Sequence, residues 1–169
     1  MANTFELISS VTVGAGGAAS IDFTSIPSTY TDLVLKVSTR GSSATSVGGH
    51  VFYIRPNGSS ANGSTRYLAG NGSTASSGTD TAIEGAGDAS DWTASTFGNT
   101  EIYIPNYAGA TNKSVSVDAV GENNGTDTRT LMYAGLWSNT AAITSLSLVP
   151  YAGTFVQYST AYLYGVKNA

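Results

Sequence analysis

Alternation of apolar and polar side chains constrains this sequence more than any other feature. In KSVSVDAVGE (residues 113–122) and TEIYIP (residues 100–105), apolar side chains recur at every second position. A period of two places successive side chains on opposite faces of a strand, so one face of each segment can be buried. No segment combines the i, i+3, i+4, i+7 apolar stripe with the capping residues of an amphipathic helix. The chain is therefore predicted to be all-β.

We expect about eight to ten strands in a single domain that covers residues 1–169. The clearest segments are residues 5–13, 19–23, 31–40, 51–55, 100–105, 113–122, 129–137, 143–150 and 159–166. Gly-rich and Asn-Gly connectors supply the positive φ angles of tight turns. This pattern predicts an antiparallel β-sandwich of two packed sheets. Its inner faces are expected to carry Ile21, Phe23, Leu33, Leu35, Ile102, Ile104, Val115, Val117, Leu146, Leu148 and Leu163.

Three Asn-Gly-Ser triplets occur within residues 56–74, PNGSSANGSTRYLAGNGST. Such a stretch could be a flexible linker, a set of glycosylation acceptors or the loops of a β-domain. Tyr67 and Leu68 are apolar anchors that a linker lacks, so a structured, looped segment is favoured. Glycosylation of these triplets needs a secretory route. The segment MANTFELISSVTVGAGG has no basic region and no continuous apolar run, so it predicts no secretory signal.

Residues 71–99 are rich in Gly, Ser and Thr and are predicted as a long loop excursion from the domain. Loops of this length in a compact domain often have a function. We expect this one to contact a neighbouring subunit around Trp92. The segment also contains four acids, which are Asp80, Glu84, Asp88 and Asp91. Loop carboxylates can hold Ca²⁺, but they can equally be solvated, and we favour the second interpretation.

Composition argues against several classes of function. Only 11% of residues are charged, the formal net charge is −4, and the seven Lys and Arg residues are scattered singly. Nucleic-acid binding needs clustered basic side chains, so we expect no nucleic-acid partner. The absence of cysteine rules out disulfides and thiolate metal sites. No run approaches the roughly 20 apolar residues of a membrane-spanning helix, so we expect no membrane partner.

The sequence offers no pattern that identifies an enzyme. His50 is the only histidine, and no G-x-S-x-G motif accompanies it. A catalytic triad needs a nucleophile and an orienting acid beside the histidine, so His50 is predicted to be structural. GENNGTDT (residues 121–128) is rich in oxygen ligands but lacks the order of an EF-hand loop, and we interpret it as a hairpin turn through Asn124-Gly125. We predict no catalytic residue, no cofactor and no metal.

Aromatic residues could form either a sugar-binding platform or packing surfaces. The chain contains ten Tyr and two Trp, and many of the tyrosines lie in or beside predicted strands. Tyrosine is enriched in subunit interfaces and is common in cores, so we favour packing over sugar binding. The residues predicted for an interface are Phe5, Leu7, Trp92, Tyr103 and Tyr107.

Four segments carry a resemblance to a known group of proteins. SIDFTSIPSTYTDLVLKVSTR (20–40), TEIYIPNYAG (100–109), LWSNTAAITSLSLVP (136–150) and FVQYSTAYLYGVKN (155–168) resemble small virion structural proteins of tailed phages, such as cyanophages. The resemblance implies a jelly-roll-like β-sandwich that serves as a decoration, cement or fibre protein. It includes no catalytic motif and implies no functional residue, and residues 71–99 match least.

Two functions are expected from this resemblance together with the composition. The first is a capsid decoration (cement) protein, made in the host cytoplasm and placed on the outer capsid surface of the virion. Its partners would be copies of itself, in a homotrimer, and the major capsid protein. The alternative is a receptor- or glycan-binding domain of a tail or head fibre. A carbohydrate-active enzyme would need two carboxylates facing one cleft, and the sequence presents no such pair.

Overall fold

The computed structural model describes residues 4–44, 50–124 and 128–167. These residues form twelve strands and no helix, and therefore no helix that could cross a membrane. The strands are β1 (Phe5–Thr12), β2 (Ile21–Phe23), β3 (Asp32–Thr39), β4 (His50–Pro56), β5 (Gly63–Gly70), β6 (Ala75–Asp80), β7 (Glu84–Gly87), β8 (Gly98–Ile104), β9 (Lys113–Glu122), β10 (Thr128–Trp137), β11 (Leu146–Pro150) and β12 (Thr160–Val166).

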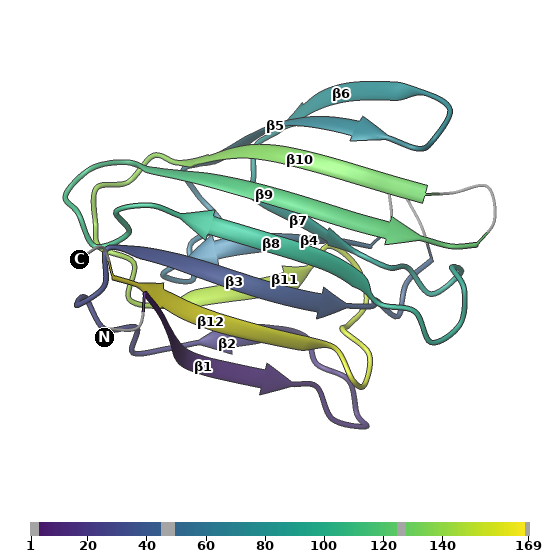
Figure 1. The fold of residues 1–169 in the computed structure, drawn as a ribbon, viewed down its shortest axis with the longest axis horizontal. Helices are drawn as coiled ribbons and strands as arrows, with labels where there is room; N and C mark the ends of the chain where they lie inside the picture. The colour runs from purple at the N-terminus through teal and green to yellow at the C-terminus, as the bar shows by residue number, and fades with distance from the viewer. Residues whose placement is uncertain (1–3, 45–49, 125–127, 168–169) are drawn as a thin grey trace.

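Two antiparallel sheets pack face to face. The larger has eight strands in the order β1-β12-β3-β8-β9-β10-β5-β6, and the smaller has four in the order β2-β11-β4-β7. In Figure 1 the larger sheet lies in front of the smaller one. The predicted all-β antiparallel sandwich is therefore confirmed.

Eight of the strands have the nested pairing of a jelly roll. β1 pairs with β12, β2 with β11, β3 with β8 and β4 with β7, so that the first strand meets the last and the pairs close inward. Wound into two sheets, these pairs give β1-β12-β3-β8 opposite β2-β11-β4-β7. This is the double-sheet jelly-roll arrangement.

The remaining four strands are two hairpins inserted into that scaffold. Hairpin β5–β6 lies between β4 and β7 in the chain, and hairpin β9–β10 lies between β8 and β11. β9 pairs with β8, and β10 pairs with both β9 and β5. The two hairpins therefore extend the larger sheet well beyond the edge of the jelly roll (Figure 1).

The core lies between the two sheets and follows the alternation of the sequence. All eleven residues predicted for the inner faces are buried, with at most 1% of their surface exposed. Aromatic side chains fill the space between them: the rings of Phe52 and Phe155 meet edge to face at 5.9 Å, and Trp137 is fully buried. Each large apolar side chain contributes roughly 1.5–3 kcal/mol through burial, so this layer drives folding.

Residues 71–99 do not form the expected long loop. β6 is the outer strand of an inserted hairpin, and β7 is a fully buried strand of the jelly roll. β7 has the sequence EGAG because its neighbours leave no room for side chains. A Cβ on Gly85 would lie 2.6 Å from the ring of Phe52, and one on Gly87 would lie 2.7 Å from the carbonyl oxygen of Thr39.

Arg40 fixes the rest of that segment to the sandwich. Its guanidinium is buried and donates hydrogen bonds to four main-chain carbonyls, those of Ser90 (3.0 Å), Trp92 (2.9 Å), Thr93 (2.8 Å) and Thr96 (3.1 Å). Arginine suits this role because its five N–H donors form a rigid planar fork. The segment after β7 is thus part of the fold.

The Asn-Gly-Ser stretch is structured, as predicted. Asn57 has a left-handed φ of 52°. Its side chain donates to the carbonyl of Ala142 (2.9 Å) and accepts from the amide of Thr144 (2.8 Å). The Oδ1 of Asn71 likewise accepts a hydrogen bond from the amide of Thr74 at 2.8 Å. These asparagines close turns, which accounts for their repetition next to glycine.

Candidate functional site

Among the residues that the structure describes, no second layer covers the outer face of the eight-stranded sheet. One row across this face consists of register partners from four adjacent strands: Leu7 on β1, Tyr164 on β12, Val34 on β3 and Tyr103 on β8. Phe5 lies two residues before Leu7 on the same face, and Tyr162 lies two residues before Tyr164. We call Phe5, Leu7, Tyr103, Tyr162 and Tyr164 the outer patch.

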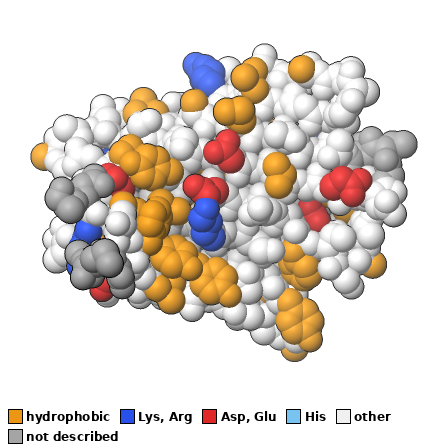
Figure 2. Space-filling model, in the orientation of Figure 1, with side chains coloured by type: hydrophobic (Ala, Val, Ile, Leu, Met, Phe, Trp, Pro, Cys, Tyr) orange, Lys and Arg blue, Asp and Glu red, His pale blue; other side chains and the backbone are white. Residues whose placement is uncertain are grey.

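The outer patch exposes large apolar groups to solvent. Phe5 is 55% exposed and Leu7 is 52% exposed, while Tyr103 and Tyr162 each expose more than a third of their surface. Figure 2 shows this face, on which hydrophobic side chains gather around a small cluster of charges. Contiguous exposed apolar groups with a polar rim mark interaction sites on soluble proteins.

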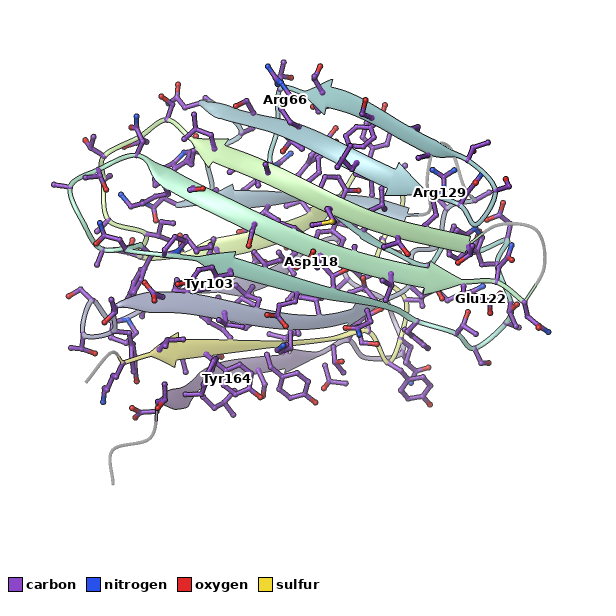
Figure 3. The ribbon with its side chains drawn as sticks, turned by 45° about the horizontal axis from the view of Figure 1, so that its top comes forward. Arg66, Tyr103, Asp118, Glu122, Arg129 and Tyr164 are labelled. Carbon is purple, nitrogen blue, oxygen red and sulfur yellow. The ribbon has the colours of Figure 1, made fainter. Side chains whose placement is uncertain are left out.

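A small cluster of charged side chains lies beside the outer patch. Lys36 on β3 forms an ion pair with its register partner Glu101 on β8. Asp118 on β9 is the next partner along the same row, and Arg66 on β5 supplies a second cation on this face. Figure 3 shows Tyr103, Asp118 and Tyr164 on this side of the sheet, on β8, β9 and β12. Such exposed pairs contribute at most about 1 kcal/mol each to stability.

The ring of Tyr103 is exposed, but its hydroxyl is fixed by a hydrogen bond. Its hydroxyl donates a hydrogen bond to Oδ2 of the buried Asp32 at 3.0 Å, and Oδ1 of that carboxylate accepts from the amide of Asn106 at 2.9 Å. The hydrogen bond from Tyr103 to Asp32 raises the pKa of the phenol. The ring is therefore a neutral, preorganised anchor, which lowers the entropy lost when a partner covers it.

The edge strand that carries Phe5 and Leu7 is also restrained. Nζ of Lys167 lies 2.9 Å from Oε2 of Glu6. The hydrogen bond and the charge of Lys167 lower the pKa of Glu6, and the same contact raises the pKa of Lys167. The ammonium of Lys167 also lies 5.2 Å from the ring centre of Tyr30. These contacts connect β1 to the chain just after β12.

The structure separates the five residues predicted for an interface into two groups. Phe5, Leu7 and Tyr103 lie together in the outer patch. Trp92 and Tyr107 are buried inside the chain, so their predicted place in an external interface is wrong. The hydroxyl of Tyr107 donates to the carbonyl of Pro27, and Trp92 packs so closely that a Cβ on Gly121 would lie 2.6 Å from its ring.

A second apolar region lies on the inserted strands, and sequence reasoning missed it. Leu68 on β5 and Met132 on β10 are register partners and are 63% and 59% exposed. They line a shallow groove of about 780 Å³, together with Arg66, Tyr67 and Tyr133. Alternation in the sequence could have revealed this exposed region. Met132 stands between the buried Leu131 and Tyr133, so its side chain must lie on the opposite face of the strand.

Comparisons were made with protein-family models, curated proteins and solved structures. None of the three finds a match for this chain.

The four acids of residues 71–99 do not form a metal site. Asp80 accepts a hydrogen bond from the amide of Ala82 at 3.0 Å, and Asp91 is exposed. Glu84 and Asp88 are buried, so they are not the solvated loop carboxylates that we expected. No group of three or more acidic or histidine side chains that could hold a metal ion occurs in the described part of the chain.

Burial changes the acidity of two of these groups. Burial, and to a smaller extent the negative charge of Asp80, raises the pKa of Glu84 to about 7. Burial also raises the pKa of Asp88, while the positive charge of Arg40 acts in the opposite direction. Glu84 therefore titrates near neutral pH inside the sandwich, and it is a candidate for pH-dependent stability.

Two other sequence predictions fall partly outside the described residues. His50 begins β4, where its main chain pairs with Gly87, and its side chain lies outside what the structure describes. β9 and β10 form the hairpin predicted around residues 121–128, although residues 125–127 of its turn are not among the described residues.

Proposed function

We propose that this chain is a structural protein of a phage virion, a capsid decoration (cement) protein that docks through the outer face of its eight-stranded sheet. The observation that carries the proposal is the outer patch, an exposed apolar surface built on rigid strands. The resemblance of four segments to virion proteins of tailed phages supplies the biological setting. The partners would be the major capsid protein and further copies of this chain, in a homotrimer.

The chemistry of the outer patch suits a protein partner. Tyrosine offers a large, stiff contact area with a hydroxyl that can remain hydrogen-bonded, and it is enriched in interface cores. The five side chains of the outer patch are uncharged, and the nearby Lys36 and Glu101 neutralise each other as an ion pair. Covering uncharged side chains costs little free energy of desolvation. Capsid subunits present a repeating surface on which many copies can make the same contact.

A structural role also agrees with the arrangement of the carboxylates. Glu101 and Asp118 are direct neighbours across β8 and β9, but they lie on an open sheet face, and Glu101 is paired with Lys36. Glycoside hydrolysis needs two carboxyl groups on opposite sides of a bound sugar. A sheet face does not provide that placement, which supports the proposal that the chain is not an enzyme.

The experiment measures docking directly. Leu7→Lys and Tyr162→Lys place a charge in the outer patch, and Thr24→Lys places the same charge at an exposed site after β2. We expect both patch variants to co-sediment at least about tenfold less with capsids that lack the protein, because a buried unpaired charge costs more than about 1.4 kcal/mol. Circular dichroism should show the same fold for all three variants.

Two outcomes would contradict this proposal. Undiminished capsid binding of both patch variants would remove the outer patch from the interface. Light scattering of the purified protein would test the trimer independently. A copy number in virions far below that of the major capsid protein would favour the alternative, a receptor- or glycan-binding domain of a tail or head fibre.

A further inference from the structure

The larger sheet ends in β6, whose outer edge is free. On one side β6 pairs with β5 in unbroken register, from Gly70 opposite Ala75 to Thr65 opposite Asp80. On the other side, no main-chain hydrogen bond reaches residues 75–80 within the described part of the chain. Figure 1 shows β6 at the top of the view, at the far side of the sheet from β1. An edge of this kind is a template on which another strand can pair.

The other three sheet edges are protected, whereas β6 is not. β1 is interrupted by a change of register between Leu7 and Ser9, β2 has only three residues, and β7 is short and fully buried. Native proteins use short strands, bulges, Pro and Lys to prevent pairing between edges. β6, with the sequence ASSGTD, contains no proline, no basic residue and no change of register. Its edge is therefore open to a second strand.

β6 also gains little stability from the fold around it. None of its six residues is buried, and only Gly78 is less than fully exposed. Ala, Gly and Asp are disfavoured in strands, and a strand without a buried face lacks the packing that usually stabilises one. β6 therefore depends on its main-chain hydrogen bonds to β5. A strand on the free edge would provide hydrogen bonds on the other side as well.

The direction of each peptide group along β6 follows from the hairpin turn. The amide of Asn71 donates to the carbonyl of Thr74 at 3.2 Å, which makes these two residues a hydrogen-bonded pair. Hydrogen-bonded and non-hydrogen-bonded pairs alternate along an antiparallel ladder. Ala75, Ser77 and Thr79 therefore occupy non-hydrogen-bonded positions opposite β5. The N–H and C=O groups of these three residues point to the free edge.

We propose that β6 pairs antiparallel with β6 of a second copy of this chain, about a two-fold axis at Ser77. In this register Ser77 lies opposite the partner's Ser77, and Ala75 lies opposite the partner's Thr79. All three residues present their N–H and C=O groups to the edge, so the three resulting pairs exchange about six hydrogen bonds. A two-fold contact of this kind is self-complementary, because the same strand serves both copies.

The charge distribution of β6 agrees with pairing to a second copy. Asp80 is the only charged residue of the strand and stands at its end. In the two-fold register the two Asp80 carboxylates would lie about six residues apart along the pair, or about 20 Å. This distance exceeds the screening length of roughly 8 Å at physiological ionic strength. The side chains nearest the axis, those of Ala75, Ser77 and Thr79, are small and uncharged, so nothing in them opposes close approach.

This contact is separate from the outer patch. It uses main-chain groups of β6, at the opposite edge of the sheet from β1. It does not rest on the proposed docking to capsids, and either proposal can fail alone. A two-fold contact cannot close a trimer by itself. Where copies are already grouped in threes, pairing through β6 joins two such groups.

Sedimentation velocity of the purified protein tests the pairing. We expect the mass of the main species to double as the concentration is raised to about 1 mM, a range that includes weak contacts. Ser77→Pro removes the outward N–H at the two-fold axis, and it spares the ladder with β5 because that N–H is not bonded to β5. The dissociation constant for doubling should rise at least about tenfold, because both copies lose a main-chain hydrogen bond at the axis.

A second set of variants tests the register and does not depend on proline being tolerated. Ser77→Lys and Ser77→Asp each place like charges opposite each other at the axis, so each should associate severalfold more weakly than the native protein. An equimolar mixture of the two should regain the affinity, because unlike charges then face each other. The control is Thr24→Lys, which adds the same charge at an exposed site outside β6 and should leave the dissociation constant unchanged.

Circular dichroism should show the native β-fold for the Lys and Asp variants. The proposal is overturned if the native protein shows no doubling of mass up to about 1 mM, and the edge would then be left to an extended segment of another protein. It is equally overturned if a folded Ser77→Pro variant doubles as readily as the native protein. The two-fold register is wrong if the mixture of Ser77→Lys and Ser77→Asp associates no better than either variant alone.

Discussion

Replacing Arg40 with methionine removes the guanidinium that donates to four main-chain carbonyls between Ser90 and Thr96. Of these, the carbonyl of Thr93 keeps hydrogen bonds from the amide and hydroxyl of Thr96. Hydrogen bonds to charged groups contribute about 1.5–3 kcal/mol each. The four bonds share one side chain, and the released carbonyls can partly rehydrate, so the losses do not add. We expect the variant to lose about 3–5 kcal/mol, the range for breaking a buried charged contact by removing one partner. Part of that loss comes from the buried Asp88, which loses the favourable positive charge of Arg40.

Urea denaturation followed by circular dichroism measures this loss. Fluorescence should also show Trp92 moving toward solvent, because its carbonyl is one of the four acceptors. Arg66→Met is the matched control, since Arg66 is exposed and should change stability by less than about 0.5 kcal/mol. Adding Asp88→Asn to the Arg40→Met variant should recover part of the stability. A loss below about 1 kcal/mol, or one equal to that of the control, would refute the role given to Arg40.

Two further predictions concern the buried strand β7. Gly98→Ala should lower the free energy of unfolding, measured in thermal melts, by about 1–3 kcal/mol, because its Cβ would lie 2.8 Å from the Cα of Gly87. The control is Gly70→Ala, which has open space around it and should leave the free energy of unfolding unchanged. Equal effects of the two substitutions would argue against the clash. The pKa of Glu84 is raised from 4.5 to about 7 in the folded protein. Between these two pH values the folded state holds a proton on Glu84 that the unfolded state has released. The free energy of unfolding should therefore fall as pH rises from about 5 to about 7, by up to about 3 kcal/mol. Glu84→Gln should remove that slope, and a variant with the same pH profile as the native protein would contradict the assignment.

Strands with a strict period of two could be predicted from the sequence, and so could the core. Ile102 and Ile104, for example, stand at alternate positions, so both side chains lie on the same face of the strand, and that apolar face packs inward. β7 could not be predicted because its burial depends on contacts that the local sequence does not show. Gly85 and Gly87 are there to admit the Phe52 ring and the Thr39 backbone, whereas Gly next to Ser and Thr normally indicates a loop.

The candidate surfaces divide along the same line. The outward position of Tyr103 could be predicted because it alternates with Ile102 and Ile104, which face the core. That Phe5, Leu7 and Tyr103 form an interface stays a prediction. Trp92 and Tyr107 were placed wrongly because large aromatics suit both cores and interfaces, and only the packing of distant segments decides between the two. A pocket around Arg55 and Trp137 left no local signal, since its walls come from four separate parts of the chain.

The two inserted hairpins account for the features that an eight-stranded jelly roll would lack. The groove beside Met132 lies on β5, β6, β9 and β10, all of which are inserted strands. A pocket of about 200 Å³ occupies the junction where the β5–β6 insertion begins and ends. The outer patch, in contrast, belongs to β1, β8 and β12 of the jelly roll itself. Nested pairing holds the strands of the jelly roll, whereas the sequence of an insertion between two strands can vary without breaking that pairing. Binding residues are for this reason common on the connections of a rigid scaffold. We therefore expect docking to depend on the jelly-roll strands, so that a substitution of an exposed residue on the insertions, such as Met132→Lys, should leave capsid binding intact.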